Sequence, residues 1–527
     1  MARSGEQPLI SVFTPAHEIG SEIDTAYRSL LRQSYSEWEW VVVDDSEAPG
    51  TAEHLASLVD RNPPGRIRVF PRSTSGSIGA SKAAAAYACR GEFLVELDHD
   101  DELLPEALEV IAATFVAHPD VDFVYSDWLD WEDRPSGGGP AFYPPGWAFG
   151  LGVYASEIVD GRRVSVALAP PLTWQTVRHV VAAPNHVRAW RTESYRRIGG
   201  HDARLEVGDD YELIVRTFLN GITARIPRPL YVQHHDPAGR NASRLRNAEI
   251  HRRVEEASHR YEQAIDQRCL ALGVTPSPPW PLTSWEPIPS ANVVIDVIAE
   301  AAADRGRPLV SVVIPTYDRP QLLARAIESV LTQSYENLEV LVAGDNCPSI
   351  DQVIASIDDR RVRHLNLATH HDDLGASPRN CALKVMARGT LVAYLDDDNR
   401  WRGDHLESLV ETLLRDSRLA FAFASLNMAE ETIICRRPRH LQIDTNALLH
   451  RRFLLERFGY WRGPTETAWA QAHDWELVSR WEHEPWAASL KPTVFYTLEQ
   501  SSRGQQLLAA VRAVADQERN AAMHAPL

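Results

Sequence analysis

Short apolar runs alternate with amphipathic stretches along the chain, which is the pattern of alternating strands and helices. Residues 9–13, 39–43 and 93–97 are largely apolar, whereas residues 23–33 space their apolar positions as a helix does. A further helix is expected over residues 105–117, with a proline at its start. Strands that are apolar on both faces suit a parallel sheet covered by helices on each side. The pattern therefore predicts an α/β fold that binds its ligands at the carboxyl ends of the strands.

The opening strand occurs twice, as PLISVFTP at residues 8–15 and as PLVSVVIP at residues 308–315. Later landmarks recur in the same order while their spacing drifts, as expected when loops differ between two copies of one fold. They are, with the first copy named before the second, Gln33-Ser34-Tyr35 and Gln333-Ser334-Tyr335, Asp45 and Asp345, Leu97-Asp98-His99-Asp100 and Leu395-Asp396-Asp397-Asp398, and Asp210-Tyr211-Glu212-Leu213 and Asp474-Trp475-Glu476-Leu477. A repeat of this length predicts two duplicated domains.

The residues between the two copies indicate the domain boundaries. Residues 240–273 are charged and helical in character, and residues 275–290 are rich in proline, which favours an extended and stiff spacer. The predicted organisation is a first domain over 1–273, a proline-rich linker over 274–304, a second domain over 305–503 and a C-terminal helix or tail over 504–527.

Composition narrows the class of protein. The chain has 527 residues, 44% of them hydrophobic and 24% charged, which is typical of a folded protein with more than one core. Acidic residues outnumber basic ones by 72 to 54, and a net negative charge argues against nucleic acid as a partner. The five cysteines are scattered without a CxxC pair, which favours free thiols in a reducing compartment over disulfides or zinc.

The sequence shows no signal of secretion or membrane insertion. Residues 1–8 lack an apolar signal core, and no apolar run approaches the ~20 residues of a spanning helix. The predicted location is therefore cytoplasmic, with peripheral association with the inner face of a membrane left open.

Clusters of carboxylates follow one strand in each copy. Asp98, Asp100 and Asp101 lie within four residues in the first copy, and Asp396-Asp397-Asp398 stands at the same place in the second. Like charges this close repel one another unless a positive group lies among them. Mg²⁺ or Mn²⁺ would relieve the repulsion and commonly bridges substrate phosphates. A solvated acidic loop explains a single copy equally well, but the recurrence favours a metal site in each domain.

In this order, the landmarks resemble those of a tandem pair of family 2 glycosyltransferase domains, over nearly the whole chain apart from the linker and the termini. The resemblance implies two GT-A domains in tandem, each with a Rossmann-like, mostly parallel sheet flanked by helices. It also implies transfer of a sugar from a nucleotide-sugar donor, a UDP-sugar by default, to a hydroxyl group, with inversion at the anomeric carbon and with Mn²⁺ or Mg²⁺ as cofactor. The acceptor stays open between a glycan, a lipid-linked molecule, a protein and a small molecule.

The resemblance also assigns donor-binding residues to this sequence. The acidic residue after the second strand contacts the base, the first Asp of the D-x-D element approaches the ribose, and a glycine segment approaches the nucleotide. The second copy keeps an arginine in its glycine segment. The first copy has a lysine there instead, for which a phosphate contact and a solvated position at a helix start are equally plausible. The assigned residues are Asp45, Gly79, Lys82 and Asp98 in the first copy, and Asp345, Gly375, Arg379 and Asp396 in the second.

The same resemblance assigns metal ligands. The last Asp of each D-x-D element binds the metal, which gives Asp100 and Asp398. A later histidine often reaches the metal or the diphosphate, and His235 is the choice here, with His234 close behind. The corresponding stretch of the second copy has no histidine, which puts its metal site or its activity in doubt.

The catalytic base is assigned to Asp210 in the first copy and to Asp474 in the second. Each ends a pair of polar residues at the start of a predicted helix, where relatives carry an acidic pair. A sugar hydroxyl is a poor nucleophile, so a positioned carboxylate that takes its proton accelerates the transfer. Capping of the helix by the aspartate is the structural alternative.

Two other functions remain open at this point. The second copy could be a glycan-binding or scaffolding module, for which the missing histidine is the only support. A sugar nucleotidyltransferase would also have an α/β nucleotide fold. That class carries a glycine-rich N-terminal loop with a following Arg and Lys, which neither residues 11–20 nor residues 311–320 supply. The sequence therefore favours two glycosyltransferase active sites.

Overall fold

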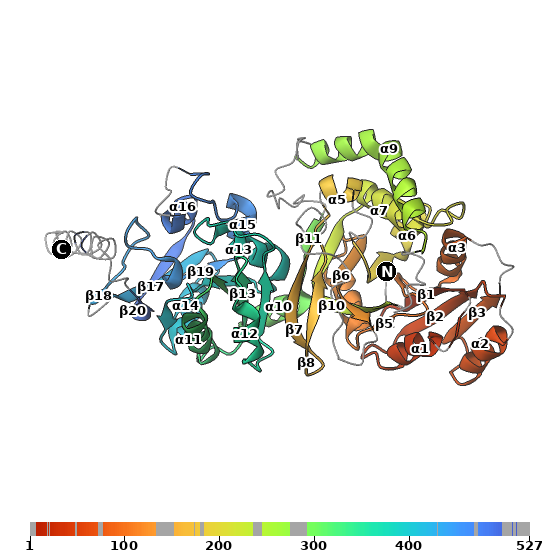
Figure 1. Cartoon of the computed structure of the whole chain (residues 1–527), viewed down its shortest axis with the longest axis horizontal. Coiled ribbons are helices and arrows are strands. Elements are labelled where there is room, and N and C mark those ends of the chain that lie inside the picture. Colours follow the sequence, from red (N-terminus) through yellow and green to blue (C-terminus); the bar gives the residue numbers. More distant parts are fainter. Residues whose placement is uncertain are drawn as a thin grey trace. The chain divides into compact units, whose positions relative to one another are not determined.

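The computed structural model describes residues 7–497, except for residues 18, 21, 48–49, 72–76, 133–151, 173, 180–183, 236–244, 274–291, 429–430 and 468–472, together with residues 509 and 513. The chain divides into two compact units (Figure 1). Unit 1 consists of Met1–Tyr154 and Val164–Val297, and unit 2 of Ala155–Arg163 and Ile298–Leu527.

Unit 1 is built on a mostly parallel sheet with the strand order β3–β2–β1–β4–β9–β6–β10–β11. Strand β9 runs antiparallel to both of its neighbours, β4 and β6. The elements are β1 (Ile10–Ala16), α1 (Ile23–Leu31), β2 (Trp38–Asp44), α2 (Thr51–Asp60), β3 (Ile67–Pro71), α3 (Ile78–Ala88), β4 (Phe93–Glu96), β5 (Glu102–Leu103), α4 (Ala107–Ala117), β6 (Phe123–Glu132), β7 (Val153–Val159), β8 (Arg162–Leu168), α5 (Trp174–His179), β9 (Arg188–Arg191), α6 (Thr192–Arg197), α7 (Asp209–Asn220), β10 (Thr223–His235), α9 (Asn247–Ala271) and β11 (Asn292–Val294).

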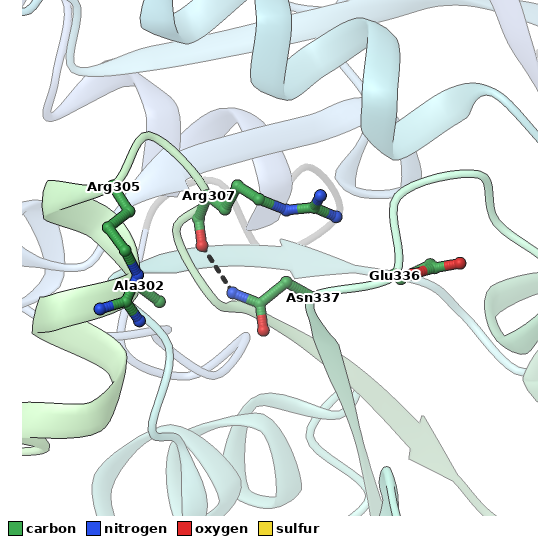
Figure 2. A pocket seen from close by; sticks show the side chains of 5 residues that line it. All are labelled: Ala302, Arg305, Arg307, Glu336 and Asn337. Atoms are coloured by element: carbon green, nitrogen blue, oxygen red, sulfur yellow. Dashed lines mark hydrogen bonds between the residues drawn. The ribbon is translucent and has the colours of Figure 1, made fainter.

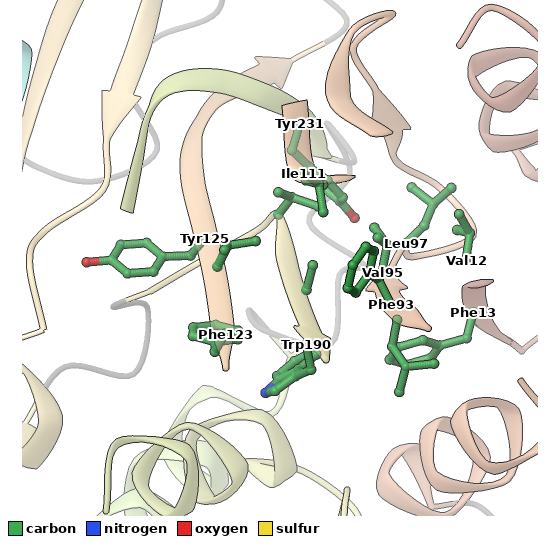
Figure 3. Packing of buried hydrophobic residues seen from close by; sticks show 14 of the residues in the cluster. Val12, Phe13, Phe93, Val95, Leu97, Ile111, Phe123, Tyr125, Trp190 and Tyr231 are labelled. Atoms are coloured by element: carbon green, nitrogen blue, oxygen red, sulfur yellow. The ribbon is translucent and has the colours of Figure 1, made fainter. Parts of the chain in front are cut away.

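The core of unit 1 forms because its central strands are apolar on both faces. All residues of β2 and β4 are buried, as are six of the seven in β1. Helices α1 and α2 lie on one side of β1, β2 and β3, and α3 lies on the other (Figure 1). Aromatic side chains fill the middle of this core (Figure 3), where the rings of Phe123 and Trp190 lie 4.9 Å apart.

Unit 2 repeats this sheet with the order β14–β13–β12–β15–β19–β17–β20. The pairing registers are equivalent: Ile10 pairs with Trp38 as Val310 pairs with Leu338. The elements are α10 (Val297–Asp304), β12 (Val310–Thr316), α11 (Pro320–Leu331), β13 (Leu338–Gly344), α12 (Ile350–Ala355), β14 (Val362–Asn366), α13 (Ala376–Cys381), the π-helix η1 (Ala382–Met386), β15 (Leu391–Tyr394), β16 (Arg400–Trp401), α14 (His405–Leu414), β17 (Phe421–Met428), β18 (Glu431–Ile433), the 3₁₀ helix η2 (Thr445–Ala447), β19 (Leu448–Arg451), α15 (Phe453–Phe458), α16 (His473–Ser479) and β20 (Trp486–Tyr496). The predicted α/β class is confirmed in both halves.

The borders differ from the predicted ones in two places. The predicted linker over 274–304 contains strand β11, which pairs with β10, and helix α10. Residues 293–295 are apolar, and this explains the strand in the predicted linker, because an apolar run extends a sheet rather than forming an extended spacer. Residues 274–291 of that linker lie outside the described residues, as does the predicted C-terminal helix except for residues 509 and 513.

The second difference is the segment Ala155–Arg163, which belongs to unit 2 although it lies in the first half of the chain. Ser156 pairs with His364 on the edge strand β14. The Glu157 carboxylate forms ion pairs with Arg363 at 3.2 Å and with Arg388 at 3.0 Å. No described helix is long and apolar enough to cross a membrane.

Candidate active site

The candidate site of unit 1 lies at the carboxyl ends of its parallel strands, as predicted. Asp45 directly follows β2, and its backbone N–H donates to the carbonyl of Ala16 at the end of β1, at 2.8 Å. The Asp45 carboxylate is buried and accepts a hydrogen bond from Ser81 on α3 at 3.2 Å. Asp98 follows β4 at the same edge, where it is half-buried.

Four side chains of alternating charge contact one another in this site, and three of them, Lys82, Glu96 and Arg188, are buried. Glu96 is fully buried and pairs with Lys82 at 2.5 Å and with Arg188 at 3.6 Å. Arg188 in turn pairs with Asp210 at 3.0 Å. Burial opposes the charge on Glu96, but Lys82 and Arg188 outweigh it and hold the pKa of this carboxyl well below its usual value. Lys82, predicted to meet a phosphate or to lie solvated at a helix start, is therefore a buried partner of Glu96.

Arg188 is a site residue that the sequence reasoning missed. It is the first residue of β9, which runs antiparallel to β4 and places Arg188 opposite Glu96. The signal available in the sequence is weak, since it consists of one charged residue at the start of an apolar run. The role of Arg188 can be recognised only from the pairing of β9 with β4, two strands that lie far apart along the chain.

The acidic pair Asp209-Asp210 begins helix α7, as predicted, and its two members differ in environment. Burial opposes the charge on Asp210, but Arg188 and Lys82 outweigh it and lower the pKa of this carboxyl. Burial raises the pKa of Asp209 to about 7, with Asp210 and Glu96 adding to the shift against the opposing effect of Lys82. Asp210 is therefore held as a carboxylate, and its side chain remains 25% exposed.

Gly79 lies near the start of α3, where the backbone of another segment approaches closely. A Cβ at this position would lie 2.6 Å from the carbonyl oxygen of Asp202 and 2.7 Å from that of Leu205. The Gly79 N–H donates to the same Leu205 carbonyl at 3.2 Å. The glycine thus lets α3 pack against the segment that leads into the acidic pair of α7.

Asp98, Asp101 and His186 bring ligand atoms within 4.8 Å of one another. The His186 Nε2 lies 3.4 Å from Asp98, and its ring stacks on Tyr231 with a centroid distance of 4.6 Å. The Tyr231 hydroxyl also donates to Asp101 at 2.8 Å. Carboxylate oxygens and one imidazole suit a cation such as Mn²⁺, so these residues fit the expected metal. His186 is a second residue that the sequence reasoning missed.

The two predicted metal ligands of unit 1, Asp100 and His235, lie in different environments. Asp100 is half-buried, and burial raises its pKa, with a further increase from Asp98. His235 is buried and pairs through Nε2 with Asp130 at 2.8 Å. Asp130 also accepts a hydrogen bond from Trp128 at 3.1 Å. Among the described residues, His186 thus forms a group of close ligand atoms with Asp98 and Asp101, whereas His235 pairs with the Asp130 carboxylate on β6.

The corresponding site of unit 2 is organised by Asn446, which is fully buried. Its Nδ2 donates to Asp396 at 3.0 Å and to Asp444 at 2.8 Å. Its Oδ1 accepts the backbone N–H of Asp396 at 2.6 Å. Neither Asn446 nor Asp444 was singled out from the sequence, because no motif marks the loop before β19.

The predicted donor-binding residues of unit 2 are already engaged with the protein. Arg379 pairs with Asp396 at 2.5 Å. Gly375 has a φ of +79°, and a Cβ there would lie 2.8 Å from the Arg379 guanidinium. The Asp345 carboxylate accepts the backbone N–H groups of His371 and Asp372 at 3.0 and 3.1 Å. These contacts fix the loop that precedes α13 at the carboxyl edge of the sheet.

Unit 2 also differs around its predicted base and metal ligand. Leu448 stands at the register position of Arg188, because Leu449 pairs with Ala393 as Ala189 pairs with Val95. Asp474 is the second residue of α16, and burial raises its pKa, with Asp396 adding to the shift. Burial likewise raises the pKa of Asp398 to about 6, with Asp396 and Asp397 adding to the shift.

Asp444 makes the stability of unit 2 depend on pH. Burial raises its folded-state pKa from 3.8 to about 7, with Asp474 and Asp396 adding to the shift. Its contribution to stability is therefore fully present below about pH 4 and lost as the pH rises through about 7. We expect Asp444→Asn to be more stable than the wild type at about pH 8 and to lose this advantage at about pH 4.

This expectation is checked by urea unfolding at the two pH values, followed through labelling of Cys435, which is buried in unit 2. The matched control is Asp416→Asn, which alters an exposed pair with Arg418. An equal effect of Asp444→Asn at both pH values would contradict the assignment.

A hollow in unit 2 lies away from this site (Figure 2). It is lined by Ala302, Arg305, Arg307, Glu336 and Asn337. Asn337 donates to the Arg307 carbonyl at 2.6 Å. These residues precede β12 and β13, so the hollow lies at the amino ends of the strands and not at the edge that carries the carboxylates.

Known proteins match most of the length of this chain. O-antigen biosynthesis protein RfbC of Myxococcus xanthus is 28% identical over 404 residues, which are 76% of this chain and 28% of that protein. An uncharacterized glycosyltransferase of Rickettsia felis is 23% identical over 434 residues, which are 80% of this chain and 66% of that protein. The chain thus spans about a quarter to two thirds of the length of these relatives.

Solved structures and one family model also match this chain. S. aureus TarS 1-349 in complex with UDP-GlcNAc is 18% identical, over 50% of this chain and 73% of that chain, with a TM-score of 0.36. Mannosyltransferase PcManGT from Pyrobaculum calidifontis in complex with GDP-Man and Mn²⁺ is 17% identical, over 51% and 75%, with a TM-score of 0.33. The model of glycosyl transferase family 2 matches residues 11–136 and 311–465, more than half of the chain. The chain therefore belongs to glycosyl transferase family 2, with one matching region in each half.

Proposed function

We propose that each unit transfers a sugar from a nucleotide-sugar donor, a UDP-sugar by default, to a hydroxyl group of an acceptor. The observation that carries this proposal is the duplicated constellation at the carboxyl edge of the sheet. Asp98 and Asp210 in unit 1 have equivalents in Asp396 and Asp474 of unit 2, on sheets of the same strand order. Family membership of both halves supports the same reaction class.

In unit 1, Asp210 takes the proton of the acceptor hydroxyl as that oxygen attacks the anomeric carbon. Arg188 keeps Asp210 ionised at 3.0 Å, and Tyr211 orients the carboxylate through a backbone N–H at 2.7 Å. Each carboxylate oxygen retains a further acceptor position for the hydroxyl. A single displacement in which the base and the leaving diphosphate stand on opposite sides of the sugar inverts the anomeric centre.

The donor is proposed to bind on the side of the site that does not carry the base Asp210. Asp45 is proposed to accept a hydrogen bond from the nucleotide base, and Asp98 is proposed to contact the ribose. A divalent cation at Asp98 and the neighbouring carboxylates would neutralise the charge that builds on the leaving diphosphate. Lys82 is proposed to act by stabilising the buried Glu96 carboxylate, with which it pairs at 2.5 Å.

Unit 2 is proposed to act in the same way, with Asp474 as the base. Burial and the neighbouring Asp396 carboxylate raise the pKa of Asp474, so its transfer is expected to need a higher pH than that of unit 1. The alternative is that only unit 1 is catalytic and unit 2 binds glycan, which the missing late histidine favours. Hydrolysis of nucleotide sugars by full-length Asp210→Asn distinguishes the two, because turnover that remains above roughly 1% of the wild type then belongs to unit 2.

The acceptor is proposed to be a growing glycan. Relatives named for O-antigen biosynthesis and as chondroitin synthase support a glycan product, although the latter matches only 23% of this chain. All five cysteines are free and buried, in agreement with the proposed cytoplasmic location.

Metal dependence is tested on nucleotide binding. We expect Mn²⁺ or Mg²⁺ to tighten the binding of UDP by roughly tenfold or more, equivalent to about 1.4 kcal/mol, because a cation held by the aspartates would offset the negative charge of the diphosphate. Calorimetry of UDP binding with each cation, and again with a chelator, measures the difference. An affinity that the chelator leaves unchanged would contradict metal-assisted binding, and the proposed donor site would then rest on the protein side chains alone.

A further inference from the structure

One position differs in chemistry between the two otherwise equivalent sites. His186 comes two residues before Arg188, which begins β9, and Asn446 comes two residues before Leu448, which begins β19. The equivalent registers of these two strands make His186 and Asn446 counterparts. Each contacts the first Asp of its D-x-D element: His186 faces Asp98 at 3.4 Å, and Asn446 donates to Asp396 at 3.0 Å.

We infer that His186 is a cation ligand in unit 1, so that unit 1 holds its metal with a nitrogen donor and unit 2 holds its metal with oxygen donors only. The inference rests on the proposed function and deepens it, because it assigns different metal preferences to the two sites. It also replaces the expected ligand His235 with a residue from a different segment of the chain.

The placement of His186 supports this role. Its side chain is 6% exposed, and its Nδ1 has no hydrogen-bond partner among the described residues. Stacking on Tyr231 fixes the plane of the ring, with Nε2 directed at Asp98. Two atoms that each bind one cation at about 2.1 Å are at most about 4.2 Å apart. The 4.8 Å limit that encloses Asp98, Asp101 and His186 therefore leaves only a small closing movement.

The competing histidine is engaged elsewhere. His235 pairs through Nε2 with Asp130 at 2.8 Å, and the Tyr154 hydroxyl also donates to Asp130 at 2.8 Å. The residue before it, His234, pairs with Glu102 at 2.9 Å. Neither lies in the group of close ligand atoms that Asp98 forms among the described residues.

Among the described residues of unit 2, no histidine forms a group of close ligand atoms with the D-x-D carboxylates. Asn399 takes the place of Asp101: its Oδ1 accepts the N–H of Thr497 at 2.7 Å, as Asp101 accepts that of His234 at 2.8 Å. Oxygen-only sets suit Mg²⁺ and Mn²⁺ alike, whereas an imidazole favours the transition metal. Unit 1 is therefore expected to select Mn²⁺ over Mg²⁺ more strongly than unit 2 does.

The test uses the full-length protein with MnCl₂ and UDP, and follows the metal itself. Pulsed electron paramagnetic resonance of bound Mn²⁺ detects a directly coordinated imidazole nitrogen, and labelling all histidines with ¹⁵N identifies the signal as histidine. The wild type is expected to show a coordinated histidine on part of the bound Mn²⁺. His186→Asn is expected to abolish this signal and to weaken one class of Mn²⁺ sites by about 10–100-fold or more, since even changes beside a ligand have effects of that size.

Two matched variants make the result specific. His235→Asn is expected to keep the histidine signal, and Asn446→His is expected to add a second one in unit 2. Asparagine already occupies the equivalent place in unit 2, so His186→Asn places there a residue that the fold accepts, and circular dichroism checks its folding. A histidine signal that persists in His186→Asn, or that disappears in His235→Asn, overturns the inference.

The outcomes also separate this inference from the proposed function. If the histidine signal depends on His186 but no nucleotide sugar is turned over, the ligand assignment stands and the proposed function fails. If sugars are turned over while bound Mn²⁺ shows no histidine nitrogen, the proposed function stands and the role of His186 is refuted.

Discussion

Replacing Asp210 by asparagine is expected to lower the turnover of unit 1 by roughly 10²–10⁴-fold, the usual contribution of a positioned general base. The amide has nearly the same shape but cannot take a proton from the acceptor hydroxyl. Binding of the donor nucleotide should remain, because Asp45 and Asp98 are unchanged and lie after β2 and β4. Turnover with each accepted donor and the affinity for UDP are the two measurements.

The matched control is Asp474→Asn, which changes the equivalent residue at the start of α16. It is expected to remove the transfer carried out by unit 2 and to leave that of unit 1. A variant that keeps full activity with every donor would show that its aspartate only caps the helix. Equal losses of all activities in both variants would show instead that the units share one reaction.

Glu96→Gln is expected to destabilise unit 1 by about 3–5 kcal/mol, because neutralising one partner of a buried ion pair leaves uncompensated charge. Glu96 is fully buried between Lys82 and Arg188, and the substitution leaves these two cations with less negative charge beside them. Urea unfolding followed by labelling of Cys89, a buried thiol of unit 1, measures the change in the free energy of unfolding of this unit.

The control for this prediction is the exposed pair Arg418–Asp416, whose side chains are 82% and 38% exposed. Asp416→Asn is expected to leave stability unchanged within error, since exposed pairs contribute little. Cysteines of unit 2, such as Cys381, give an internal reference in Glu96→Gln. A loss of protection that is equal in both units would indicate that the chain unfolds as one cooperative body and not that unit 1 is selectively weakened.

The sequence carries enough information for the repeat, the fold class and the order of the site residues. Strands such as β2 are buried on both faces, and that condition appears directly as a continuous apolar run. Asp45 and Asp210 could be singled out because each stands at an element border, where polar residues in an apolar context are conspicuous. These are local properties, which can be recognised from short segments of the sequence.

The contacts between distant segments could not be predicted in this way. Whether Lys82 reaches a phosphate or a buried carboxylate depends on Glu96 and on the antiparallel strand that brings Arg188 beside it. The sequence likewise offers several histidines near the site without saying which ring faces Asp98. His235 ends β10 and pairs with Asp130 on the neighbouring strand β6, while His186 lies in a loop that carries no motif.

The position of the segment Ala155–Arg163 determines how this protein can be divided into fragments. A fragment that begins at residue 305, after the obvious linker, would lose the strand that covers the edge of β14 and the carboxylate that faces Arg363 and Arg388. An open strand edge invites self-association. The two halves therefore share one fold but are not interchangeable, and a fragment of the second half alone would need the segment Ala155–Arg163 restored to it.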